Sequence, residues 1–164
     1  MAGFRIGQGY DIHPFAPSGT GRRLVLGGVE IPHDRGLAGH SDADAVLHAV
    51  TDALLGAIGA GDIGGHFSDR DPRHKDRPSR EFVAETMRMV HARGYRVGNV
   101  DVTIHAEEPR LAPHVEAMRA VLSELLEVEP DAANVKATRG EGLGPIGRAE
   151  GIAAQAVVLL EPKG

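Results

Sequence analysis

Three polar side chains in two separate segments have the types and spacing of metal ligands. Asp11 and His13 lie two residues apart in an expected strand, and because strand side chains alternate, both point to one face. His48 lies in the otherwise apolar segment 45–50, where burial of an unpaired polar group costs free energy. Two imidazoles and one carboxylate suit Zn²⁺, and three protein ligands leave a fourth tetrahedral position for a substrate oxygen. The pattern therefore indicates an open, catalytic metal site.

A second interpretation of these residues stays open at this point. An Asp-x-His pair is common, and many such pairs make only surface hydrogen bonds. His48 lies one helical turn from both Asp44 and Asp52, so it is equally explained as a core histidine bonded to either carboxylate. The residues from Ser41 to Asp44 resemble a capping box, which predicts a helix over 42–58 with Ser41 as its N-cap.

The glycine-dense segment 140–151 is the other candidate for chemistry. Glycine lets backbone N–H groups approach an anion closely, and Glu141 could hold the divalent cation that accompanies a diphosphate. The segment has neither the Walker nor the dinucleotide fingerprint. A tight turn before the last strand, with Arg148 and Glu150 as an ion pair, explains it more simply.

Composition limits the class of protein. The chain has 164 residues, 41% of them hydrophobic, which suits one domain over 1–164. A net charge of −5, 4% aromatic residues and no Trp argue against a nucleic-acid-binding surface. Without cysteine, any metal must be bound by histidine and carboxylates. No signal peptide or membrane span is predicted from the sequence, so we expect a soluble, cytoplasmic protein.

The elements expected to carry these residues alternate between strands and helices. A hairpin of strands 4–12 and 22–31 is followed by helix 42–58 and a long polar loop over 62–78, which suits either a binding lid or a solvated surface segment. Ser79 should cap a second helix with an apolar stripe of Phe82, Val83, Met87, Val90 and His91. Strand 95–106, helix 111–126 and strands 133–138 and 151–160 complete the chain. This order predicts an α/β fold, an α+β sandwich whose mixed sheet is covered by helices on one face. The polar face of strand 95–106 is left for a subunit interface or an active-site cleft.

Taken together, the chain resembles the family of 2-C-methyl-D-erythritol 2,4-cyclodiphosphate synthases of the non-mevalonate isoprenoid pathway. The resemblance covers nearly the whole sequence in order. Its segments are Arg5–His13, Gly27–Val29, Ile31–Pro32, His40–Ala49, Thr51–Ala57, Gly61–Gly64, Gly98–Ile104, Val135–Thr138 and Gly147–Ile152.

The resemblance implies a phosphorus–oxygen lyase. In the family's reaction, the 2-phosphate of 4-diphosphocytidyl-2-C-methyl-D-erythritol 2-phosphate attacks the β-phosphate of its own diphosphate, and CMP leaves. Asp11, His13 and His48 are implied to hold Zn²⁺ or another divalent cation, and Glu141 to hold Mg²⁺ or Mn²⁺. Such chemistry asks the protein mainly to align reacting oxygens and neutralise charge.

The resemblance also implies a set of substrate-binding residues. His40 and Ser41 would contact phosphate, with His40 and Arg139 as transition-state stabilisers. The methylerythritol pocket would comprise Asp62, Ile63 and Gly64, beside a loop that contains Phe67, Asp69 and Asp71. The cytidine pocket would comprise the segment of Ala106, Glu107, Glu108, Pro109, Arg110 and Leu111, together with Ala137 and Thr138.

The family forms a homotrimer, which implies that the sheets of three subunits face the trimer axis and that active sites lie between neighbours. Pro145 and Arg148 would line an axial cavity that could take an isoprenoid diphosphate.

The chain departs from the family pattern at three positions. Arg139 replaces a usual threonine, Pro145 an aromatic or aliphatic residue, and Arg110 a frequent lysine.

Two other functions stay open. A zinc-dependent nucleotide pyrophosphatase would use water instead of the tethered phosphate and would release CMP without a cyclic product. A trimeric, metal-stabilised module would bind isoprenoid diphosphates or a partner enzyme without turnover.

Overall fold

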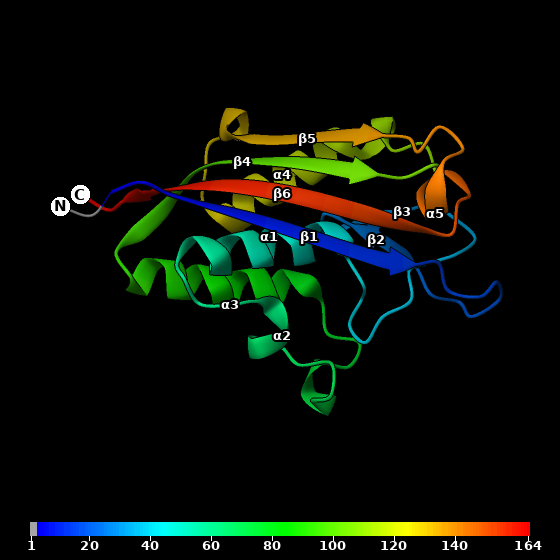
Figure 1. Cartoon of the computed structure of the whole chain (residues 1–164), viewed down its shortest axis with the longest axis horizontal. Helices are drawn as coiled ribbons and strands as arrows, with labels where there is room; N and C mark the ends of the chain where they lie inside the picture. Colours follow the sequence, from blue (N-terminus) through cyan, green and yellow to red (C-terminus); the bar gives the residue numbers. More distant parts are fainter. Residues whose placement is uncertain (1–2) are drawn as a thin grey trace.

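The chain builds a four-stranded mixed sheet with its main helices on one face. The computed structural model describes residues 3–164. The sheet order is β1 (Arg5–Pro14), β6 (Gly151–Pro162), β4 (Tyr95–His105) and β5 (Ala133–Thr138). Strand β6 is antiparallel to β1 and β4, whereas β4 and β5 are parallel. Figure 1 shows the four strands side by side across the molecule, so the predicted α/β class and mixed sheet are confirmed.

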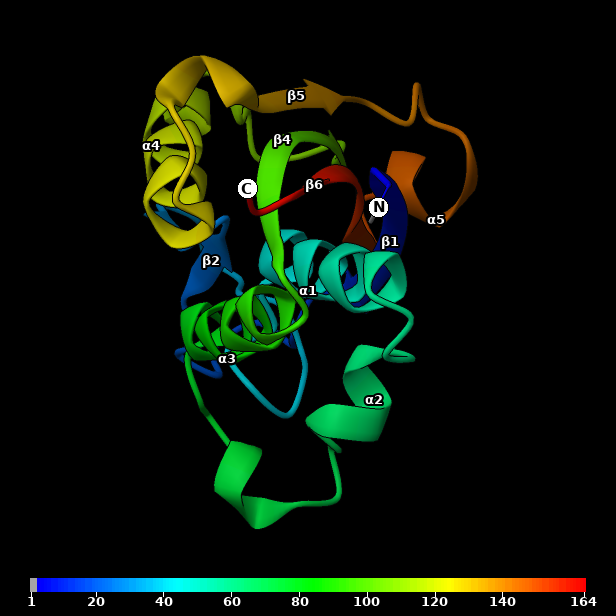
Figure 2. The same ribbon diagram turned by 90° about the vertical axis from the view of Figure 1, so that its left-hand side faces the viewer.

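Helices α1 (Ala45–Ala57), α3 (Ser79–Ala92) and α4 (Val115–Leu126) cover the inner face of the sheet. Figure 2, viewed nearly along the strands, shows these helices on one side, while the opposite side carries only the short helix α5 (Gly144–Gly147) near β1. The expected alternation of β4 is confirmed, because Val100, Val102 and Ile104 are buried and the residues between them are partly exposed. No helix among residues 3–164 is long and apolar enough to span a bilayer.

The predicted N-terminal hairpin is wrong. Strand β1 pairs with β6, while β2 (Leu24–Leu26) and β3 (Val29–Ile31) form a separate two-stranded sheet. The reason is the turn between them: Gly27 and Gly28 have φ values of 57° and 72°. Two successive residues with positive φ close a tight hairpin, so this segment folds onto itself instead of extending along β1.

The two predicted helix caps are also wrong. Helix α1 is capped by Asp44, not Ser41, because the Asp44 carboxylate accepts the N–H groups of Val46 and Leu47. It also accepts the N–H groups of Gly27 and Gly28 at 2.8 and 2.6 Å, which attaches the β2–β3 turn to the start of α1. Helix α3 begins at Ser79 with Pro78 as its N-cap, and Pro78 offers no side-chain acceptor.

Shorter elements complete the connections. The polar loop contains α2 (Ile63–His66) and a 3₁₀ turn, η1 (Pro72–His74); further 3₁₀ turns, η2 (Ala112–His114) and η3 (Pro130–Ala132), flank α4. His91 does not belong to the buried stripe of α3, because it is partly exposed and its Nε2 lies 3.7 Å from Glu127 Oε2.

Candidate metal centre and active site

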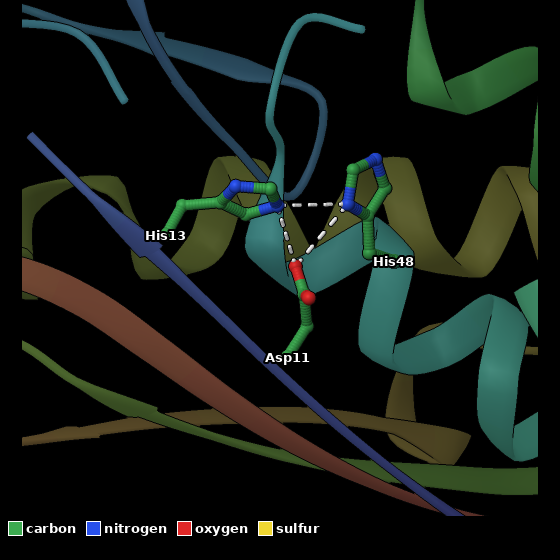
Figure 3. Close-up of side chains that lie close together, drawn as sticks. All are labelled: Asp11, His13 and His48. Carbon is green, nitrogen blue, oxygen red and sulfur yellow. Dashed lines mark hydrogen bonds and ion pairs between the residues drawn. The ribbon is translucent and has the colours of Figure 1, made fainter. Parts of the chain in front are cut away.

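Asp11, His13 and His48 converge on one point between β1 and α1. His13 Nε2 lies 2.9 Å from Asp11 Oδ2, and His48 Nδ1 lies 3.2 Å from the same oxygen. The two ring nitrogens are 3.1 Å apart. Figure 3 shows the three polar atoms pointing toward one another, two from the strand and one from the helix. The sequence-based prediction that these side chains share one site is therefore confirmed.

Glycines in β1 allow this close approach. A Cβ on Gly9 would lie 1.9 Å from the carbonyl oxygen of Ala49, and one on Gly7 would lie 1.8 Å from that of Ala53. Only glycine lets β1 pack this tightly against α1. The contact brings the strand within reach of His48, which projects from the same helix.

The donor atoms fit a divalent cation. The Nδ1 atom of His13 donates to the carbonyl oxygen of Ala38 at 2.9 Å, because a carbonyl can only accept. The lone pair of neutral His13 is therefore on Nε2, the atom that faces the cluster. In a tetrahedral zinc site with bonds of about 2.0–2.2 Å, neighbouring ligand atoms are roughly 3.3–3.6 Å apart. The observed separations of 2.9, 3.1 and 3.2 Å lie just below that range, so a small outward shift of the side chains would fit the ion.

Electrostatics in the cluster favour a cation. Burial alone would raise the pKa of Asp11, but its contacts with His13 and His48 outweigh burial and lower that pKa well below its ordinary value. Burial alone would lower the pKa of His13, but its contact with Asp11 outweighs this and raises the pKa. Asp11 thus stays ionised at neutral pH and attracts positive charge to the site.

The alternative partners proposed for His48 are engaged elsewhere. Asp44 accepts backbone N–H groups from α1 and from the β2–β3 turn. Asp52 accepts the N–H of Ile63 at 2.7 Å. The second ring nitrogen of His48, Nε2, instead lies 2.8 Å from Ser79 Oγ and 3.1 Å from Ser41 Oγ. His48 is therefore not a core histidine paired with its helical neighbours.

The cluster opens into a cavity of about 350 Å³. Most predicted phosphate and methylerythritol residues line it, together with two that the sequence reasoning did not include, His74 and Phe82. The full lining is Asp11, His13, His40, Ser41, His48, Ile63, Gly64, Phe67, Asp69, His74 and Phe82. His74 and Phe82 were overlooked because one lies in an irregular loop and the other reads as a core residue of α3. His74 could have been predicted, because it is a histidine within the polar loop 62–78, which was a candidate binding lid.

Two predicted residues lie near this cavity without lining it. The Asp62 carboxylate caps α2 by accepting the N–H of Gly65 at 2.9 Å. The Asp71 carboxylate pairs with Arg73, while its backbone carbonyl accepts a 3.0 Å hydrogen bond from His40 Nε2. Asp71 therefore helps to orient His40 through its backbone.

A second cavity, of about 370 Å³, lies at the ends of β4 and β5. It collects the predicted cytidine residues except Glu108 and adds Ala112 and Arg139. Its lining is Ala106, Glu107, Pro109, Arg110, Leu111, Ala112, Ala137, Thr138 and Arg139. The Arg139 guanidinium pairs with Glu107, whose other oxygen accepts the N–H of Gly140 at 3.1 Å. The two cavities share no lining residue.

The glycine-dense segment folds into a tight loop around α5. A Cβ on Gly140 would lie 2.5 Å from the backbone nitrogen of Gly147. Arg148 Nε donates to Glu150 at 2.6 Å, the ion pair that the turn interpretation predicted. Glu141 is exposed, and Pro145 lines a smaller cavity with Ile12, His13, Pro14, Ile146, Glu150 and Gly151. His13 links this smaller cavity to the Asp-His-His cluster, whereas Glu141 and Arg148 line neither it nor the two larger cavities.

A mixed sheet that holds an open Asp-His-His cluster against a cavity of small-molecule size is the arrangement of a metal-dependent enzyme. The YgbB family model matches residues 4–161, and the chain belongs to this family. A relative from Geobacillus kaustophilus (strain HTA426), named 2-C-methyl-D-erythritol 2,4-cyclodiphosphate synthase, is 59% identical over 96% of this chain and 98% of its own length.

Solved structures agree with the family assignment. The bifunctional IspDF from Campylobacter jejuni is 38% identical with a TM-score of 0.91, over 97% of this chain and 42% of that chain. A CDP-bound form of 2C-methyl-D-erythritol-2,4-cyclodiphosphate synthase is 41% identical with a TM-score of 0.86, over 96% of this chain and 100% of that chain.

Proposed function

We propose that this chain is a 2-C-methyl-D-erythritol 2,4-cyclodiphosphate synthase, a lyase of non-mevalonate isoprenoid biosynthesis. An oxygen of the substrate's 2-phosphate bonds to the β-phosphorus of the diphosphate. The bond from that phosphorus to the oxygen bridging the α-phosphate breaks, and CMP leaves with the bridging oxygen. The observation that carries this proposal is the Asp11, His13 and His48 cluster at the mouth of a cavity, in a chain that shares 59% identity with a relative of that activity.

Asp11 Oδ2, His13 Nε2 and His48 Nδ1 would hold Zn²⁺, since their donor types and spacing suit it. Glu141, an exposed oxygen ligand on the glycine-dense loop, would hold Mg²⁺ or Mn²⁺ with the diphosphate. When bound, such cations neutralise the phosphate oxygens as Lewis acids.

The protein's own contribution is to fold the substrate so that nucleophile and electrophile meet. Because both belong to one molecule, alignment supplies a large part of the rate. His40 donates from Nε2 to Asp71, which holds its ring beside Ser41 in the first cavity for contact with phosphate. Asp62, Ile63 and Gly64 would position the methylerythritol hydroxyls, with Phe67, Asp69 and Asp71 in the loop beside them.

The second cavity would bind the cytidine moiety, and the CDP-bound relative supports a cytidine nucleotide as ligand. Its contributors would be Ala106, Pro109, Arg110, Leu111, Ala137 and Thr138. Arg139 would exchange its pairing with Glu107 for a substrate phosphate oxygen and act with His40 on the transition state. Arg139 can make this exchange because 67% of its side chain is exposed.

We also propose a homotrimer in which each active site joins the first cavity of one subunit to the second cavity of its neighbour. The outer sheet face supports this, since Ile6, Tyr10, Ile12 and Val157 are 72, 49, 43 and 45% exposed there. The sheets would face the trimer axis, where Pro145 and Arg148 would border a cavity for an isoprenoid diphosphate. The single domain over 1–164 and the cytoplasmic location stay predictions.

Phosphorus NMR tests the activity directly. The purified protein is incubated with 4-diphosphocytidyl-2-C-methyl-D-erythritol 2-phosphate, Zn²⁺ and Mg²⁺, with a His48→Gln variant as the inactive control. We expect the coupled phosphorus signals of a cyclic diphosphate together with CMP. CMP without the cyclic product would establish a hydrolase instead, and intact substrate with bound metal would establish a binding module.

A further inference from the structure

A buried hydroxyl lies behind His48, on the side away from the metal ligands. Ser79 is the first residue of α3 and is fully buried. Its Oγ atom lies 2.8 Å from His48 Nε2, whereas His48 Nδ1 faces Asp11 and His13. The proposed reaction gives Ser79 no role, although it contacts a metal-ligating ring directly.

The direction of this hydrogen bond follows from what lies behind Ser79. Ser79 Oγ donates to Asp42 Oδ1, and an ionised carboxylate can only accept. A hydroxyl has one proton, so at His48 the Ser79 oxygen must accept. Ser41 Oγ, 3.1 Å from the same nitrogen, can accept as well, so one Nε2–H serves both hydroxyl oxygens. The proton of neutral His48 is then on Nε2, and its lone pair is on Nδ1, toward the cluster. A ring with the opposite tautomer would present an N–H to the metal position and could not bind a cation.

We infer that Ser79 is a positioning residue for the metal site, and that Asp42 sets the direction of its hydrogen bond. This inference deepens the proposed function and rests on it for the metal. The Asp42–Ser79–His48 chain of hydrogen bonds fixes both the tautomer and the orientation of the His48 ring, as outer partners of metal-binding histidines do.

Local sequence explains why Asp42 can do this. Pro78, the N-cap of α3, provides no acceptor for the first N–H groups of the helix. Asp42 Oδ2 accepts the Ser79 N–H at 3.0 Å, so a carboxylate from the segment before α1 caps α3. Asp42 Oδ1 also accepts the Asp44 N–H at 3.2 Å. One side chain thereby connects the starts of α1 and α3, which leaves Ser79 little freedom relative to His48.

The first test uses the wild-type protein without metal. Two-bond proton–nitrogen NMR of the histidine rings at pH 8 reports which nitrogen of His48 carries the proton. We expect a protonated Nε2 and an unprotonated Nδ1. A proton on Nδ1 would overturn the inference, whatever the protein's affinity for zinc.

The second test compares zinc affinities by competition with a chromophoric chelator. Ser79→Ala should weaken zinc binding roughly 10- to 100-fold, the usual effect of losing an outer partner. Asp42→Asn should also weaken it, because the amide can donate to Ser79 Oγ and release the Ser79 proton toward His48 Nε2. In that variant the NMR signature of His48 should shift toward the Nδ1-protonated tautomer, which a merely structural role would not produce.

Ser123→Ala is the matched control, since Ser123 is a buried serine of α4 whose Oγ has no partner among the described residues. It should bind zinc as the wild type does. Zinc affinity of Ser79→Ala within twofold of wild type would refute the positioning role. If Ser79→Ala fails to fold, the positioning role is judged from the zinc affinity of Asp42→Asn and from the His48 tautomer in the wild-type NMR spectrum. Failure of the wild type to bind zinc would refute the metal site itself and leave the tautomer measurement valid.

Discussion

At the scale of single residues, Asp11 connects the two imidazoles of the cluster. Its Oδ2 atom is the common neighbour of His13 and His48, at 2.9 and 3.2 Å. Although burial alone would raise its pKa, the two histidine contacts lower that pKa, so the carboxylate is the permanent negative charge of the site. Two neutral imidazoles without it would attract a cation much less strongly.

We therefore expect Asp11→Asn to weaken zinc binding by more than the ~100-fold typical of losing an outer partner. The amide retains the shape of the carboxylate but neither its charge nor its affinity for the metal. The same variant should bring the pKa of His13 down, because its contact with Asp11 is what raises it. Chelator competition and histidine NMR titration measure the two effects. Asp131→Asn, in the exposed turn η3, is the control, and equal zinc affinity in both variants would contradict a ligand role for Asp11.

Arg139 allows a second residue-scale prediction, because its partner in the structure is Glu107 and not a phosphate. If Arg139 moves to the diphosphate on binding, Arg139→Thr loses a charge-assisted hydrogen bond, worth about 1.5–3 kcal/mol. CDP affinity, measured by calorimetry, should then fall roughly 10- to 100-fold. Arg139→Lys keeps the charge but not the planar guanidinium, so its CDP affinity should lie between those of the wild type and Arg139→Thr. An unchanged affinity in Arg139→Thr would show that the guanidinium stays on Glu107.

At the scale of elements, regular local patterns were predictable from the sequence and contacts between distant segments were not. Helix α1 and strand β4 were predicted close to their observed bounds, because their burial follows the helical and strand periods. The cap of α1 was mistaken because Asp44 also serves Gly27 and Gly28, partners that no local pattern reveals. The metal ligands could be predicted from their residue types. The hydrogen bonds that connect Asp42, Ser79 and His48 could not, because they depend on how α3 packs against the start of α1.

Asp44 provides an element-scale prediction of pH dependence. Burial raises its pKa from 3.8 to about 6, despite the N–H groups that it accepts. A carboxyl with a raised folded pKa favours the protonated folded state, so its contribution to stability is complete below pH ~4 and is lost as pH rises through about 6. The loss is on the order of 3 kcal/mol.

The measurement is the free energy of unfolding of wild type minus that of Asp44→Asn, taken from urea titrations between pH 4 and 7. Because the asparagine does not titrate, other carboxylates largely cancel in the difference. We expect the difference to decrease with rising pH in this window. A flat difference would mean that the four backbone N–H donors fully offset the cost of burying the charge.

At the scale of the whole molecule, the outer sheet face divides into an apolar and a polar half. Ile6, Tyr10, Ile12 and Val157 are exposed on β1 and β6, while the outer side of β4 and β5 carries polar groups such as Asp101, which pairs with Lys136. An apolar stripe of this kind is typical of a surface that another subunit covers. The two cavities of one chain share no residue, which fits a site assembled from two subunits.

Val157→Glu tests this assembly, because it puts a charge at the centre of the proposed interface, where burial without a partner costs several kcal/mol. Light scattering should show trimers for the wild type and monomers for the variant, while Arg88→Glu, an exposed change on α3, should stay trimeric.

The decisive comparison is between zinc binding and turnover in the monomeric Val157→Glu variant. Asp11, His13 and His48 all come from one chain, so the monomeric variant should still bind zinc with near wild-type affinity. It should lose cyclic diphosphate formation, because the nucleotide-binding cavity would have to come from a neighbouring subunit. A fully active monomer would show that one chain completes the site alone and would overturn the proposed interfacial arrangement.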